Sequence, residues 1–90
     1  MTVEPEKKML LAAVLLAVAH QDAKNVKYLG VRAYRMKRIS ELIADEARRF
    51  VSSSAFREMC EQIDVEADVL RAMSPAMALD SYNKLMEPHK

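Results

Sequence analysis

The feature that most constrains the fold is an uninterrupted apolar run of eleven residues, MLLAAVLLAVA, at positions 9–19. A helix that spans a bilayer needs about 20 apolar residues, so this run is too short for a membrane segment. A membrane-surface helix would need a basic polar face, and only Lys7 and Lys8 are available for it. The run therefore predicts a buried helix over residues 5–23, which begins at the acidic, proline-marked segment 4–6.

This first helix is apolar on nearly every side, which leaves two ways of covering it. It is either the central helix of the fold, or it shares one face with a second copy of the protein. A 90-residue chain has little protein with which to cover such a helix, so we expect a homo-oligomer. The sequence leaves open whether the cover comes from within one chain or from between copies.

The composition favours helices in the rest of the chain as well. There is one glycine among 90 residues, there is no tryptophan, and good helix formers such as Ala, Leu, Met, Glu, Lys and Arg dominate. Apolar residues recur at spacings of three and four between positions 36 and 50, which predicts a second helix over residues 32–51. Its stripe consists of Met36, Ile39, Ile43, Ala47 and Phe50.

Cap and turn residues divide the remaining sequence into three shorter helices. A run of three serines at 52–54 and the turn at Asp64 and Val65 delimit helices over residues 54–63 and 66–73. Ser74 as N-cap and Pro75 at the first helical position start a fifth helix, whose stripe is Met77 or Ala78 with Tyr82 and Leu85. We therefore predict an all-α fold, a compact five-helix domain over residues 1–90 with frayed ends at 1–4 and 87–90.

The segment 54–73 has the pattern of a helix-turn-helix-like corner. Such a corner needs a small residue where its helices cross and apolar residues on both helices, and Cys60 suits the crossing. Asp64 stands where glycine is usual in the turn, and aspartate tolerates the left-handed conformation less well. The charges from 58 to 68 are all negative and would be repelled by phosphates, so the second helix is a poor reader of DNA. The inward-facing residues are Met59, Ile63, Val65, Leu70 and Met73.

The stretch EARRFVSSSAFREMCEQIDVEADVLRAM, residues 46–73, resembles a stretch of small helical proteins of proteobacterial prophages and phage-like elements. Residues 13–23 resemble the helix that commonly precedes it, so the likeness covers about half of the chain. Asp64 and Ala67 replace the glycine and the proline of the family's turn. The resemblance implies a phage-associated small helical protein. The matching positions are Ala47, Phe50, Ser53 or Ser54, Phe56, Cys60, the turn 64–67 and Arg71.

Charge is unevenly distributed, although the whole chain carries a formal net charge of only +1. Between residues 24 and 49 eight basic residues face three acidic ones, a local net charge of +5. Tyr28 and Tyr34 are interleaved with these charges, as in many phosphate-contacting surfaces. The basic residues are candidates for nucleic-acid binding: Lys24, Lys27, Arg32, Arg35, Lys37, Arg38, Arg48 and Arg49.

The sequence contains no recognisable arrangement of catalytic residues. His20 and His89 have no nucleophile or metal-ligand partners nearby in sequence, and Cys60 lies on the packed side of its helix. We therefore expect no enzyme activity, no cofactor, no bound metal and no small-molecule substrate. One cysteine, seven methionines and no signal peptide predict a cytoplasmic protein.

Two functions remain in competition after these exclusions. The first hypothesis is a phage-type protein that binds double-stranded DNA in regulation or packaging, with the basic region 24–49 on the phosphates. The alternative is a protein-interaction module, for example a phage-encoded inhibitor of a host protein complex. Its candidate partner-binding residues are Glu61, Glu66, Asp68 and Arg71.

Overall fold

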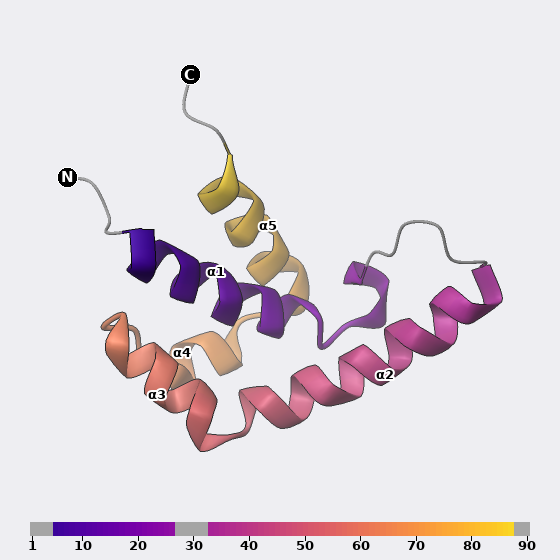
Figure 1. Ribbon diagram of the computed structural model, residues 1–90, viewed down its shortest axis with the longest axis horizontal. Coiled ribbons are helices and arrows are strands. Elements are labelled where there is room, and N and C mark those ends of the chain that lie inside the picture. Colours follow the sequence, from indigo (N-terminus) through magenta and orange to yellow (C-terminus); the bar gives the residue numbers. More distant parts are fainter. Residues whose placement is uncertain (1–4, 27–32, 88–90) are drawn as a thin grey trace.

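The computed structural model describes residues 5–26 and 33–87, and the side chains of 33–36 lie outside this description. Five α-helices and one 3₁₀ turn occupy the described chain, with no strand among these residues, so the all-α prediction is confirmed (Figure 1). The boundaries predicted for the last four helices are met to within one residue. The elements are α1 (Pro5–Ala19), η1 (Ala23–Asn25), α2 (Ala33–Val51), α3 (Ser54–Gln62), α4 (Ala67–Ala72) and α5 (Pro75–Met86).

The apolar helix α1 is the central helix of the fold, which is one of the two arrangements that its sequence allows. It packs against α2, α3, α4 and α5, and its longest contact is with α5. The long helix α2 extends away from this group, and its N-terminal half contacts η1 (Figure 1). The molecule is consequently flat, with principal extents of 44, 36 and 19 Å.

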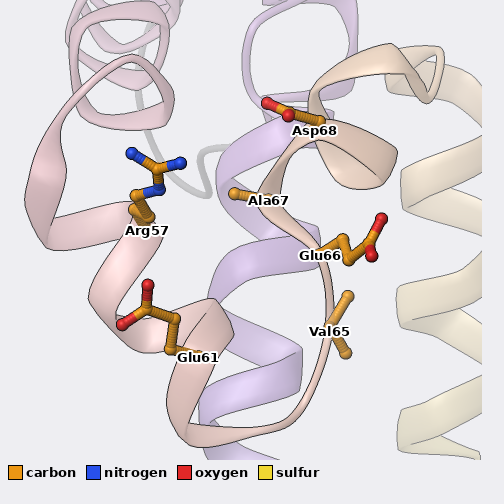
Figure 2. Close-up of a pocket in the computed structure, with 6 residues that line it drawn as sticks. All are labelled: Arg57, Glu61, Val65, Glu66, Ala67 and Asp68. Atoms are coloured by element: carbon orange, nitrogen blue, oxygen red, sulfur yellow. The ribbon is translucent and has the colours of Figure 1, made fainter.

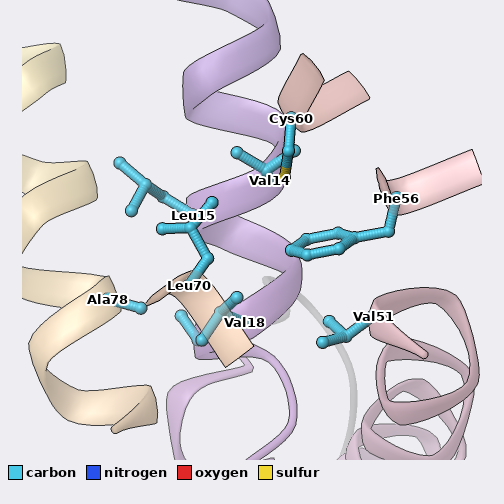
Figure 3. Close-up of a cluster of buried hydrophobic side chains, with 9 residues drawn as sticks. Val14, Leu15, Val18, Val51, Phe56, Cys60, Leu70 and Ala78 are labelled. Atoms are coloured by element: carbon cyan, nitrogen blue, oxygen red, sulfur yellow. The ribbon is translucent and has the colours of Figure 1, made fainter. Parts of the chain in front are cut away.

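One cluster of buried side chains joins α1 to the other helices (Figure 3). Val14 and Val18 of α1 and Phe56 and Cys60 of α3 are its largest fully buried members. Full burial of a side chain such as valine or phenylalanine contributes about 1.5–3 kcal/mol, so these contacts dominate the stability of the fold. The other buried members are Leu15, Ala19, Val51, Leu70 and Ala78.

The first helix ends four residues earlier than the sequence predicts, at Ala19 rather than at residue 23. The backbone amides of Gln21 and Asp22 donate to the Val18 and Ala19 carbonyls at 3.3 Å in a tighter final turn, and two side-chain amides add further bonds to the same oxygens. Gln21 Nε2 donates to the Val18 carbonyl at 3.3 Å, and Asn25 Nδ2 donates to the Ala19 carbonyl at 3.0 Å. The prediction was wrong because the periodicity of apolar residues does not reveal such caps.

Serine caps start α3 and α5 at the predicted residues. Ser53 Oγ accepts from the Phe56 amide at 3.4 Å and donates to the Phe50 carbonyl at 2.6 Å. Ser74 Oγ accepts from the Met77 amide at 3.2 Å. Of the two residues that the sequence offers for the stripe of α5, Ala78 is the buried one.

The turn between α3 and α4 is closed by two backbone hydrogen bonds. The Val65 amide donates to the Cys60 carbonyl at 2.9 Å, and the Asp64 amide donates to the Glu61 carbonyl at 3.2 Å. This pair of bonds defines a Schellman motif, in which the residue at the Asp64 position is left-handed. Asp64 adopts φ of 59°, so an aspartate takes the place that glycine would occupy without strain.

Candidate functional site

The candidate nucleic-acid interface lies at the end of the molecule formed by η1 and the start of α2, opposite α3 (Figure 1). Six basic residues and no acidic residue occur between positions 24 and 38 of the sequence. The side chains of Lys24, Lys37 and Arg38 are exposed here. We call these three residues the basic end.

Two lysines of the basic end lie close together in space although thirteen positions separate them in sequence. Lys24 of η1 and Lys37 of α2 line one hollow of about 290 Å³, together with Ala23, Ser40 and Glu41. Among the described residues, no ion pair involves Lys24, Lys37 or Arg38. Two lysines and one glutamate give the hollow a net charge of +1, which favours an anion such as a phosphate.

The C-terminal half of α2 differs from the basic end. Arg48 forms an ion pair with Asp45 at 2.5 Å, and Asp45 and Glu46 match the exposed Arg48 and Arg49 in number. The charge of this half is therefore nearly balanced. It belongs to the predicted region 24–49, but it offers phosphates little net attraction.

Three predicted basic residues cannot be assigned to the interface in the same way. Lys27 and Arg32 lie outside the described residues, and so does the side chain of Arg35, whose backbone belongs to α2. The prediction that these three residues bind nucleic acid rests on the sequence alone.

A second candidate site is an acidic groove of about 360 Å³ between α3 and α4 (Figure 2). Arg57 and Glu61 come from α3, whereas the other residues come from the turn and the start of α4. Three carboxylates and one guanidinium give the groove a net negative charge. The structure therefore brings together three of the four predicted partner-binding residues, Glu61, Glu66 and Asp68.

Arg71, the fourth, holds the corner onto the rest of the fold. Its Nε donates to the Val51 carbonyl at 2.8 Å, and its guanidinium lies 5.7 Å from the centre of the Phe56 ring. It also pairs with Asp68 at 3.4 Å. The hydrogen bond ties α4 to the last residue of α2, which gives Arg71 a structural task. Its contact with a partner stays a prediction.

Apolar grooves along α1 form a feature that the sequence reading did not locate. One groove of about 450 Å³ lies between α1 and α5, and another of about 340 Å³ lies between α1 and α2. Ala13 and Leu16 line both of them. The sequence contains a signal for this exposed face of α1. Spacings of four, three and four separate Met9, Ala13, Leu16 and His20.

The two titratable groups that burial perturbs show no sign of catalytic activation. Burial raises the pKa of the Cys60 thiol, and the nearby Arg71 only partly opposes this, so the thiol stays protonated and unreactive. Burial lowers the pKa of His20. Among the described residues, no group of three or more His, Cys, Asp or Glu side chains is placed to hold a metal ion.

Within 5–26 and 33–87, no helix has both the length and the apolar character needed to cross a bilayer. No protein-family model matches the chain, and the comparisons with curated proteins and with solved structures find no match either. The resemblance to small phage proteins therefore stays a prediction from residues 46–73.

Proposed function

We propose that the protein binds the phosphate backbone of double-stranded DNA through its basic end. The observation that carries the proposal is that Lys24 and Lys37 line one hollow, with the exposed Arg38 next to Lys37 in the sequence of α2. Basic side chains that neutralise phosphates release condensed counterions, which supplies most of the affinity in sequence-independent binding. A role in phage regulation or packaging follows from the resemblance and is part of the same proposal.

The charge of the α3–α4 corner supports placing DNA at the basic end and not at the corner. In a DNA-reading helix-turn-helix, the first residues of the second helix contact the bases. The corresponding positions here are Glu66 and Asp68, both exposed and both negative. Phosphates would repel this surface, so the corner serves as scaffold in the proposed complex.

The test is fluorescence anisotropy of a labelled duplex of random sequence, titrated with protein at several salt concentrations. We expect log K to fall linearly with log salt, by about 0.9 for each phosphate contact. The double variant Lys37→Glu with Arg38→Glu should lower the magnitude of that slope by about 2 and weaken binding strongly.

A matched control is available on the same helix. Arg48→Glu with Arg49→Glu makes the same charge change in the balanced half of α2 and should weaken binding much less. Equal losses from both pairs would show that net charge alone matters, and no binding by the wild type at low salt would refute the proposal.

The acidic groove favours a second candidate function, docking of a partner protein through a basic side chain. Glu61, Glu66 and Asp68 line a volume of about 360 Å³ in which Arg57 is the one basic residue, with the Glu66 carboxylate pointing away from α3 (Figure 2). A basic peptide binding to the wild type but not to Glu61→Lys with Asp68→Lys would support this function. Salt-sensitive DNA binding without any peptide binding would favour the first proposal.

A further inference from the structure

The outer face of α1 carries apolar residues that the packing described above leaves accessible. Met9 is 74 % exposed, Ala13 is exposed, and Leu16 and His20 are half-buried. Their spacing of four, three and four is that of the contact positions in paired α-helices. We call these four residues the open stripe.

Two grooves border the open stripe, one on each half of α1, and we call the stripe with its two grooves the valley. Tyr82 and Met86 of α5 flank its N-terminal half, and Ile43 and Phe50 of α2 flank its C-terminal half. The two grooves join at Ala13 and Leu16, which line both. The valley therefore runs along most of α1, from Pro5 to His20.

We propose that this valley binds α1 of a second copy of the chain, with the two helices antiparallel. The two-fold axis passes between Ala13 and Leu16. Because the spacing of the open stripe reads the same in both directions, Ala13 then faces Leu16 of the second copy, and Met9 faces its His20. A small residue opposite a large one allows close packing, and the unbranched Met9 fills the hollow beside His20 and Phe50.

Charge complementarity favours a second copy as the occupant and fixes its direction. Apart from His20 and Tyr82, the charged or titratable side chains that line the valley are Lys8, at the α5 end, and Glu46, at the α2 end. Antiparallel pairing brings Lys8 of one copy to the end that holds Glu46 of the other. Parallel pairing would bring like charges together at both ends, which is unfavourable.

The mass of the protein in solution tests whether two copies associate through the valley. Sedimentation velocity over a concentration series should give the wild type a mass about twice the 10.2 kDa of one chain. Ala13→Glu places a charge at the centre of the valley on an exposed position, and it should leave a folded monomer, as judged by circular dichroism. Met77→Glu is the matched control, because Met77 is 62 % exposed but does not line the valley, and it should remain a dimer.

Disulfide trapping tests the direction. Met9→Cys and His20→Cys chains should cross-link to each other in a mixture, whereas each variant alone should not. In an antiparallel pair the two copies of residue 9 lie about 16 Å apart along the helices, beyond the reach of a disulfide of about 7 Å. The native Cys60 is buried and does not compete.

Three results would overturn the proposal: a wild-type monomer at all concentrations, a dimer that survives Ala13→Glu, or cross-linking of each variant with itself. The proposal is independent of the DNA proposal, since no residue of the basic end lines the valley. Loss of one activity in a variant therefore leaves the other measurable.

Discussion

The basic end and the α3–α4 corner are both charged and exposed, but different buried residues lie beneath them. The corner stands on the main core, because Phe56, Cys60 and Leu70 beneath it are buried. The basic end rests on Val26, Ser40 and Ala44, which are buried outside that cluster. Substitutions should therefore act on folding at the corner and on binding at the basic end.

The largest effect is expected from Phe56→Ala. Phe56 is fully buried, packs edge-to-face on Phe50 at 5.7 Å and lies beneath Arg71. Its truncation should lower the free energy of unfolding by about 3–5 kcal/mol, measured by urea denaturation. Phe56→Leu keeps most of the volume and should cost clearly less. A loss below about 1 kcal/mol for Phe56→Ala would contradict the contrast between the two regions, because it would show that the corner does not depend on the core.

Arg71→Met should have the next largest effect. It keeps the length of the side chain but removes the hydrogen bond to the Val51 carbonyl and the charge over Phe56. We expect a loss of about 1–2 kcal/mol in thermal or urea unfolding. Asp68→Asn is the control, since its ion pair with Arg71 is largely exposed and contributes little. Equal losses from both variants would assign the effect to the ion pair instead.

Asp64→Gly should stabilise the corner. Asp64 holds a left-handed conformation that costs a non-glycine residue about 1–2 kcal/mol, so glycine should raise the melting temperature, with part of the gain lost to a more flexible unfolded chain. Asp64→Ala keeps the strain while removing the charge. If alanine stabilised as much as glycine, relief of acidic repulsion would explain the gain.

Lys37→Ala with Arg38→Ala should have the smallest effect on folding. Both side chains are exposed, so the free energy of unfolding should change by no more than about 0.5 kcal/mol while DNA affinity falls. Unfolding curves and anisotropy measured on the same preparation separate the two quantities. A large loss of stability would show that the basic end is part of the scaffold, contrary to the comparison.

Local sequence signals accounted for most of the fold. Ser53, Ser74 and Pro75 started helices where the sequence predicted, because cap chemistry acts within a few residues. The predicted end of α1 was wrong because the chain tightens after Ala19, where backbone and side-chain amides of residues 21–25 bond the last carbonyls, and the apolar periodicity does not reveal this. The structural task of Arg71 was not predictable for a similar reason, since its bond to Val51 spans twenty residues and only the folded chain brings the two together.

The candidate sites were less predictable than the helices, because each depends on two elements. The sequence assigned eight basic residues to one region, but it could not show that Lys37 meets Lys24 across a hollow while Arg48 pairs with Asp45. The acidic groove was easier, because its residues lie within a short segment of α3, the turn and α4.

The most direct test of the central claim is a titration of the isotope-labelled protein with a short DNA duplex, followed by amide nuclear magnetic resonance. We expect the amide chemical shifts of Lys24, Lys37 and Arg38 to change progressively as DNA is added, with those of residues 54–73 almost unchanged. Shifts concentrated in 66–72, with the basic end unmoved, would contradict it and return the α3–α4 corner to the role of DNA reader.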